Sequence, residues 1–286
     1  MKNSTFSRCA VHNLRAFYRS KQKRMIRFGQ PDLIKTLLLQ PQPEDLEWLL
    51  PAQNFAHVEE CCRRKPDDEQ FCDISVCPRS STSHRVLLAE KACVAQYAER
   101  LRAVMVTYVP PDKVAKLGNL DSINGAQEVT ALLAAFVAAW EVFDSTIMVI
   151  GSPDISYNEN PRNLDLELSA AARKRRHWHQ FHFHFVIIAE DPKSLADALH
   201  SYLLKGQKAA DREFMVKPTY CLGRTVMYCT KIRPVRRAAG RDKRGNYKPK
   251  SRYLAKAPKT ETVRWLAALR SDQRIFTFHK PGRSTP

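Results

Sequence analysis

One stretch of the sequence decides the expected fold: residues 177–188 read His-Trp-His-Gln-Phe-His-Phe-His-Phe-Val-Ile-Ile. Residues two apart in a β-strand lie on the same face of the strand. His182 and His184 are therefore expected to share one face, with imidazoles close enough to bind a single metal ion. The three phenylalanines of the stretch then point to the opposite face, which suits burial beneath helices. The alternative for a His-x-His pattern is two solvent-facing histidines on a half-buried strand.

The patterns on both sides of this stretch predict an α+β domain in which helices cover an antiparallel β-sheet. Alternating or β-branched residues predict short strands, and apolar residues at helical spacing predict helices. We expect strands at residues 103–109, 145–150 and 181–189, and helices at 83–101, 126–143, 192–205 and 260–270. The strand that ends at residue 150 is expected to be broken by Gly151 and Pro153, because both residues interrupt regular pairing.

We expect three regions along the chain. Residues 1–60 form a helical N-terminal accessory region, with short helices at 32–39 and 44–50. Residues 61–235 form the central domain, which opens with a cysteine-rich segment. Residues 236–286 form a basic C-terminal extension. There is no internal repeat.

The charge balance points to a polyanionic partner. The 286 residues include 47 Lys and Arg against 29 Asp and Glu, a net charge of +18. Nucleic acid is the first candidate and an anionic membrane surface the second. The sequence lacks an apolar run of membrane-spanning length and a signal peptide, so we expect a cytoplasmic protein without membrane association. In that compartment the eight cysteines are expected to be thiols or metal ligands.

Three further residues would complete a metal site with chemistry. Asp154 follows the second predicted strand and would add a carboxylate oxygen to the two imidazoles; Asp165 and Glu167 are competitors. Tyr228 and Lys231 are three residues apart in an amphipathic segment, so on a helix they share a face, which Arg224 joins. The alternatives are a turn-forming aspartate and a tyrosine that packs in the core.

These pieces, in this order, resemble the motifs of the HUH endonucleases, and most closely those of plasmid-type rolling-circle replication initiators. The first motif of that family is a strand with threonines, matched here only by Thr107. The second is His-hydrophobic-His, matched by His182-Phe-His184. The third is Tyr-x-x-Lys, matched by Tyr228-Cys-Thr-Lys231. The resemblance covers about residues 60–235, and a weaker resemblance extends over residues 260–278.

The resemblance implies a mechanism and a set of partners. Mg²⁺ or Mn²⁺ would be held by His182, His184 and Asp154. Tyr228 would attack a DNA phosphate, leaving a 5′-phosphotyrosine link and a free 3′-hydroxyl primer, with Lys231 stabilising charge. The substrate would be single-stranded or hairpin DNA at a replication origin, and the host helicase and polymerase would be partners.

Two other groups of residues carry weaker expectations. The basic run Arg173-Lys174-Arg175-Arg176 and Arg224 would contact DNA phosphates, with a solvated surface loop as the alternative for the run. Family members often carry a cysteine-rich knuckle before the first motif. Here Cys61 or Cys62, together with Cys72, Cys77 and His84, would supply four ligands for a structural Zn²⁺, although their spacing fits no common zinc pattern.

Three other functions compete with replication initiation. A transposase or relaxase of a mobile element would share the two histidines and the tyrosine. A non-catalytic nucleic-acid-binding protein would need only the basic charge. An iron oxygenase with two histidines and a carboxylate usually shows His-x-Asp and does not need a charge of +18.

Overall fold

A computed structural model describes most of the chain from residue 46 onwards. The described residues are 46–47, 50, 52–64, 72–111, 113–159, 177–204, 213–231, 235–238, 250–252, 254 and 256–282. The predicted helix at 32–39, residues 44, 45, 48 and 49 of the predicted helix at 44–50, the basic run Arg173–Arg176, and the competing ligands Asp165 and Glu167 lie outside these residues.

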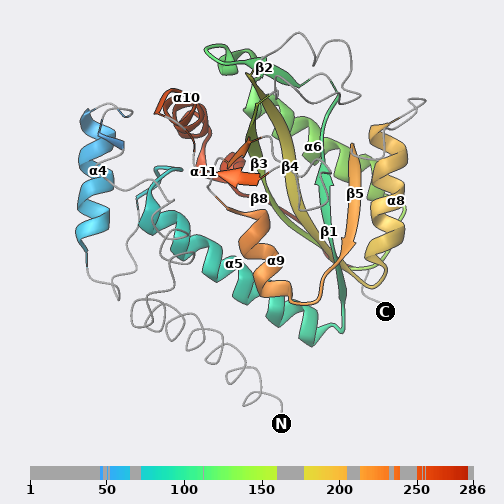
Figure 1. The fold of residues 1–286 in the computed structure, drawn as a ribbon. Helices are drawn as coiled ribbons and strands as arrows, with labels where there is room; N and C mark the ends of the chain where they lie inside the picture. The colour runs from blue at the N-terminus through green and yellow to red at the C-terminus, as the bar shows by residue number, and fades with distance from the viewer. Residues whose placement is uncertain are drawn as a thin grey trace.

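An eight-stranded sheet forms the centre of the molecule (Figure 1). Its main path runs β5-β1-β4-β3-β6-β7, while β2 also pairs with β4 and β8 also pairs with β3. All pairings are antiparallel except that of β3 with β6. The strands are β1 Arg102–Tyr108, β2 Val114–Lys116, β3 Ile147–Glu159, β4 His177–Ala189, β5 Phe214–Pro218, β6 Val235–Ala238, β7 Lys250–Arg252 and β8 Phe276–Lys280. The predicted α+β class is confirmed.

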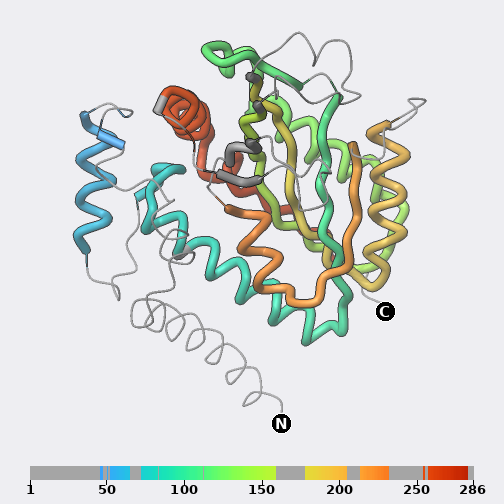
Figure 2. The backbone as a smooth tube through the Cα atoms, in the orientation of Figure 1, coloured from blue at the N-terminus to red at the C-terminus, as the bar shows by residue number. Residues whose placement is uncertain are grey.

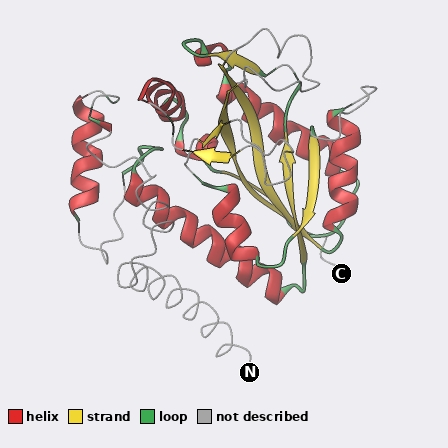
Figure 3. Cartoon of the chain, in the orientation of Figure 1, coloured by secondary structure: helices red, strands yellow, loops and turns green. Residues whose placement is uncertain are grey.

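Helices flank both faces of this sheet (Figure 3). They are α4 Ala52–Arg63, α5 Pro78–Ala98, α6 Gly125–Trp140, α8 Pro192–Leu203, α9 Leu222–Cys229, α10 Lys256–Ala267 and α11 Ser271–Arg274, with a 3-10 turn at Leu120–Ser122. The phenylalanine face of β4 packs in the larger core with α6, α8 and α10. The histidine face packs its Val186 and Ile188 in a second core against α5 and α9.

Strand β3 differs from its prediction, because it continues through Gly151 and Pro153 instead of ending at Ile150. A Cβ on Gly151 would lie 2.4 Å from Cβ of Phe185, so glycine permits the close approach of β4. Away from β4, β3 pairs with β8 up to Gly151 and with β6 from Ser156 onwards. Pro153 lies in the gap between these two partners. Its missing N–H therefore removes no bond from either ladder.

Within the region predicted as a basic C-terminal extension, the described strands pair into the same sheet and α10 packs in the larger core. Figure 2 shows the C-terminal part of the chain returning to lie beside the sheet. Glu261 of α10 accepts hydrogen bonds from the backbone N–H groups of Gly118 and Leu120 and lies 3.0 Å from Nε2 of His179. Trp265 of α10 is buried in the larger core. Long-range packing of apolar residues in α10 and β8 therefore attaches this basic segment to the domain.

The expected boundary between residues 60 and 61 also falls inside a packed element. Helix α4 runs to Arg63, and its Val58 and Cys61 are both buried in the larger core. The N-terminal end of the described chain is thus continuous with the central domain.

One helical stretch in the described part of the chain, Leu120–Trp140, has the length and apolar composition of a membrane span. It contains α6, whose Val129, Leu132 and Phe136 are buried in the larger core. These contacts pack one face of the helix against the sheet.

Candidate functional site

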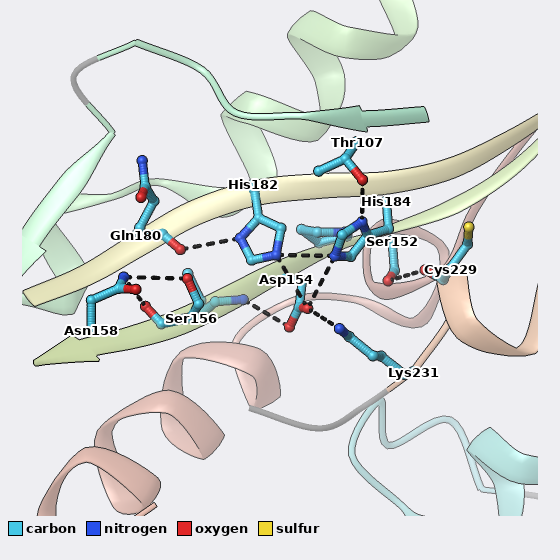
Figure 4. A network of polar contacts seen from close by, with 12 residues as sticks. Thr107, Ser152, Asp154, Ser156, Asn158, Gln180, His182, His184, Cys229 and Lys231 are labelled. Atoms are coloured by element: carbon cyan, nitrogen blue, oxygen red, sulfur yellow. Dashed lines mark hydrogen bonds and ion pairs between the residues drawn. The ribbon is translucent and has the colours of Figure 1, made fainter. Parts of the chain in front are cut away.

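The register of three strands brings the predicted ligands together. His182 lies opposite Asp154 of β3, and His184 lies opposite both Ser152 of β3 and Thr107 of β1. Residues opposite each other in an antiparallel pair have their side chains on the same face. All five polar side chains are therefore directed to the face that α9 covers, where they form one network (Figure 4). Asp154 lies within β3, not after it as predicted.

The three candidate ligands are buried and close together. The Nε2 atoms of His182 and His184 are 3.1 Å apart, and Oδ2 of Asp154 lies 3.4 Å from the first and 3.7 Å from the second. Each side chain is about nineteen-twentieths buried or more, with 3–4% exposed. Two ligands at about 2.1 Å from one octahedral ion lie about 3.0 Å apart, so these spacings suit a shared ion.

Asp154 supplies the second observation that fits a metal. Its Oδ1 accepts a hydrogen bond from the N–H of Ile155, whereas its buried Oδ2 accepts none of good geometry from the described residues. A buried carboxylate oxygen is costly to leave without a partner. Lys231 lies within ion-pair distance of this oxygen, but an ion shared with the two imidazoles would satisfy it directly.

Hydrogen bonds behind the histidines orient their rings. Nδ1 of His182 lies 3.3 Å from the carbonyl oxygen of Gln180, which can only accept, so Nδ1 carries a proton and Nε2 is the nitrogen turned to the site. Nδ1 of His184 lies 2.9 Å from the hydroxyl of Thr107. That hydroxyl can accept from Nδ1–H and leave Nε2 of His184 free for the same ion. Such outer partners fix the orientation of metal-binding imidazoles.

Helix α9 places the predicted nucleophile over this site. Its Leu222, Val226 and Cys229 are buried against the sheet, and the hydroxyl of Ser152 donates to the carbonyl of Cys229. Tyr228 therefore lies on the outer side of the helix and is 44% exposed. Its ring centroid is nevertheless 5.1 Å from that of His184. Tyr228 is thus in contact with both solvent and the buried histidines.

Lys231 connects the tyrosine with the candidate metal ligands. Its Nζ lies 3.0 Å from Oδ2 of Asp154 and 4.5 Å from the ring centroid of Tyr228. Burial opposes its charge, but the attraction of Asp154 and the interaction with Tyr228 raise the pKa of Lys231 above its usual value. Burial likewise opposes ionisation of Asp154, but Lys231 and the two histidines hold the pKa of this carboxyl well below its usual range. Both groups are charged at neutral pH.

Four cysteines form a second cluster, between α4 and the start of α5. Thiol sulfurs of Cys61, Cys72 and Cys77 lie within 4.8 Å of one another, and Sγ of Cys62 lies 4.0 Å from Sγ of Cys77. Four sulfurs at about 2.3 Å from a tetrahedral zinc ion lie about 3.8 Å apart. Among the described residues His84 is not part of this cluster, and its side chain is exposed on α5. The mutually close group thus contains Cys61, and the other alternative, Cys62, lies beside Cys77.

The pKa values of two of these thiols favour the thiolate form, which binds a cation. Hydrogen bonds with Cys77 lower the pKa of Cys62 to about 7 and that of Cys72 to about 6. The same bonds raise the pKa of Cys77, whereas burial raises that of Cys61. A lowered pKa favours the thiolate, the state in which cysteine binds a metal.

The remaining candidates divide into three groups. Arg224 lies on α9 with an exposed side chain, as a DNA-contacting residue requires. Tyr220, the other tyrosine near the helix, lies before α9 and is 95% exposed. The basic run Arg173–Arg176 falls outside the described residues.

Sequence patterns missed two buried arginines that hold the end of α9. Arg85 of α5 donates to the carbonyl of Met227 and to the hydroxyl of Thr230. Arg274 of α11 donates to the carbonyls of Pro153 and Lys231. Neither arginine belongs to a local motif that would distinguish it from the other basic residues of the chain.

Comparison of the chain with protein-family models, with curated proteins and with solved structures finds no match.

Proposed function

We propose that this protein is a metal-dependent DNA-nicking enzyme that uses Tyr228 as its nucleophile and starts rolling-circle replication. One observation carries the proposal: a half-exposed tyrosine, a partly buried lysine and a set of two histidines and one carboxylate lie side by side. The ring of Tyr228 lies 5.1 Å from that of His184, and Lys231 contacts both Tyr228 and Asp154. The resemblance of these residues to the HUH motifs supports the same reaction.

Tyr228 is the nucleophile of the proposed reaction. Its phenolic oxygen attacks the phosphorus of a DNA phosphodiester, and a new O–P bond forms as the bond from phosphorus to the 3′-oxygen breaks. The tyrosine proton passes to solvent, and the released 3′-oxygen takes up a proton. The products are a 5′-phosphotyrosine link and a free 3′-hydroxyl, which can prime a polymerase. The covalent link retains the phosphodiester energy, so the strand can be rejoined.

Lys231 and the ligand set stabilise the charge that develops in this step. Because the pKa of Lys231 is raised, its ammonium stays charged and acts as an electrostatic stabiliser, not as a base. His182, His184 and Asp154 would hold Mg²⁺ or Mn²⁺, which when bound polarises the scissile phosphate. Thr107 and the carbonyl of Gln180 keep the two imidazoles oriented.

Unpaired DNA is the substrate that this arrangement favours. A tyrosine on a short helix reaches a phosphate only where the strand is single or extruded, as in an origin hairpin. The net charge of +18 suits a polyanion, and exposed Arg224 lies on the same helix as the nucleophile. By family resemblance, the host helicase and polymerase would then use the nicked strand.

The four-cysteine cluster is proposed to hold a structural Zn²⁺. Cys61, Cys62, Cys72 and Cys77 provide four sulfur ligands, the donor set of closed structural zinc sites. Such a site would fasten α4 to the start of α5 and so support the helix that packs against α9. Because all four positions are thiols, no open position remains for catalysis.

Two histidines and a carboxylate are also the ligand set of non-haem iron oxygenases. In this protein an ammonium lies 3.0 Å from the carboxylate, and a half-exposed tyrosine lies beside it. A cation and a nucleophile next to the metal suit attack on a phosphate. The proposal of phosphoryl transfer is therefore preferred.

A covalent adduct tests the proposal. The full chain would be incubated with Mn²⁺ and single-stranded oligonucleotides that carry the hairpins found beside its gene. We expect a denaturation-resistant protein–DNA adduct, which peptide mapping places on Tyr228. A His182→Ala, His184→Ala double variant should bind DNA and form no adduct. Undiminished adduct formation by this variant would exclude the metal role, and absence of any adduct in the parent would exclude the reaction.

A further inference from the structure

We propose that Arg274 is a positioning residue of the nicking site: its buried guanidinium holds the main chain of Lys231 against β3, beside Asp154. This inference rests on the proposed function in assigning a catalytic consequence, but the positioning itself is independent of any reaction. Arg274 is the last residue of α11, and only 1% of its surface is exposed.

The guanidinium joins two segments that carry the catalytic charges. Nη1 of Arg274 donates to the carbonyl of Pro153 at 3.2 Å, and Nη2 donates to the carbonyl of Lys231 at 2.8 Å. Asp154 directly follows Pro153 in β3. The side chains of Asp154 and Lys231 in turn form the 3.0 Å ion pair. One planar group thus fixes the backbone on both sides of that pair.

The sheet provides the place for this arginine. Between Gly151 and Ser156, β3 has β4 on one side and neither β8 nor β6 on the other. The carbonyl of Pro153 points into this gap, where no strand among the described residues satisfies it. Arg274 supplies the missing donor to Pro153 and also donates to the carbonyl of Lys231.

Burying the charge of Arg274 costs stability, so its role is to donate hydrogen bonds and not only to fill space. Asp154 attracts its charge, but among the described residues no carboxylate lies within ion-pair distance of it, and its Nε has no hydrogen-bond partner. A buried cation with partly satisfied donors is expensive for the fold. An apolar side chain would fill the same volume without this cost but would leave the carbonyls of Pro153 and Lys231 unpaired.

Helix α9 itself has a separate anchor. Arg85 of α5 donates to the carbonyl of Met227 at 2.6 Å and lies 3.3 Å from the hydroxyl of Thr230. The helix also buries Leu222 and Val226 in the second core. Loss of Arg274 should therefore leave α9 in place and release chiefly the residue that follows it, Lys231.

The test compares Arg274→Lys and Arg274→Met with Arg270→Met. Arg270 is an exposed arginine in the same part of the chain that pairs with Asp272. Lysine keeps the charge but cannot donate in a fixed fork to two carbonyls. If Arg274→Met fails to fold, Arg274→Lys decides the result, provided that its Tm is close to that of the parent.

The first readout does not depend on nicking. Limited acetylation of the full chain, followed by mass spectrometry, measures the reactivity of Lys231 relative to Lys113. Lys113 pairs with Glu128 away from the site. We expect Lys231 to react several-fold faster in both Arg274 variants and at the parental rate in Arg270→Met. An unchanged reactivity of Lys231 in folded variants would overturn the proposal.

The second readout connects the position with the reaction. At saturating DNA, the rate of adduct formation should fall about 10- to 100-fold in Arg274→Lys, because a small displacement of a charge costs catalysis heavily. The Kd for DNA should stay at the parental value. An unchanged adduct rate beside increased Lys231 reactivity would overturn the catalytic part. A parent that forms no adduct would instead exclude the proposed function, and the acetylation result would still decide the positioning.

Discussion

Nζ of Lys231 lies 3.0 Å from Oδ2 of Asp154 and 4.5 Å from the centre of the Tyr228 ring, so one ammonium links the candidate metal ligands to the candidate nucleophile. Lys231 can reach Asp154 because α9 ends at Cys229 and the residues that follow bring the chain close to β3. In the proposed reaction, a charge placed here would act on both the attacking oxygen and the phosphate.

Replacement of Lys231 should therefore affect the rate more than binding. Lys231→Met removes a preorganised charge, and we expect adduct formation at saturating DNA to slow by about 100-fold or more. Lys231→Arg keeps the charge and should retain more of the rate. Single-turnover kinetics with Mn²⁺ measure both. Equal rates for the parent and Lys231→Met would show that the ammonium has no part in the chemistry.

The nucleophile can be tested with a matched pair of tyrosines. Tyr228→Phe removes one oxygen from a residue beside His184, and Tyr220→Phe removes one from a tyrosine that is 95% exposed. We expect Tyr228→Phe to bind DNA and Mn²⁺ as the parent does and to form no adduct. Tyr220→Phe should form the adduct normally. Mapping of the nucleotide to Tyr220, or to a residue other than tyrosine, would refute the assignment.

Thr107 is expected to raise the metal affinity of the site through its hydrogen bond to His184. Thr107→Val removes the hydroxyl that lies 2.9 Å from Nδ1 of His184 and leaves the ring without its partner. Loss of such a bond typically lowers metal affinity or activity by about 10- to 100-fold. Thr130→Val is the control, because its hydroxyl bonds only to a carbonyl within α6. Mn²⁺ titration followed by electron paramagnetic resonance would measure the change, and equal affinities in the two variants would contradict it.

The strand that carries the histidines was predictable because its signal is local. Alternation along β4 places His182 and His184 on one face and the phenylalanines on the other, and the described structure has this arrangement. The Tyr-x-x-Lys pattern likewise singled out Tyr228 and Lys231, but Lys231 lies beyond the end of α9 at Cys229, so the predicted shared helix face is wrong although the two side chains are in contact. The alternation along β4 needs only the geometry of one element.

The rest of the site depends on contacts between distant segments. Pro153 signals the end of a strand in local terms, yet β3 continues because its proline faces the gap between β8 and β6. Arg274 is 43 residues beyond Lys231 in the sequence and is one of 47 basic residues, so nothing local singles it out. No local pattern singles out Glu261 either. Its hydrogen bonds to the backbone of Gly118 and Leu120 hold α10, in the region predicted as a basic C-terminal extension, against the domain.

The dependence of DNA affinity on salt tests the predicted basic contacts. Each phosphate contact to single-stranded DNA contributes about 0.7 to the slope of log affinity against log salt. Replacing all of Arg173–Arg176 by glutamine should lower the magnitude of the slope by up to about 3 if all four contact phosphates. Arg224→Gln should lower it by about 0.7. Fluorescence anisotropy over a range of salt concentrations gives the slope, and an unchanged slope would place the substituted residues away from the DNA.

The four-cysteine cluster should bind zinc in a pH-dependent way, because the pKa values of two of its thiols are lower than is usual for cysteine. The pKa of Cys72 is lowered to about 6 and that of Cys62 to about 7, whereas burial raises that of Cys229, next to Tyr228, above its usual range. A lowered pKa means that the thiolate is present above that value and is lost as the pH falls through it. Zinc affinity should therefore be high at pH 8 and should fall steeply below about pH 6, where protons compete for the sulfurs.

Alkylation of the zinc-free protein with iodoacetamide should show the same order. Cys72 and Cys62 should reach half of their maximal rate between about pH 6 and pH 7, and Cys229 should stay unmodified over this range. Added zinc should protect the cluster, with one ion bound per chain by elemental analysis. Cys72→Ser should abolish binding, whereas Cys93→Ser, outside the cluster, should preserve it. Alkylation of Cys72 that begins only near pH 9, without protection by zinc, would show that the four sulfurs are ordinary thiols.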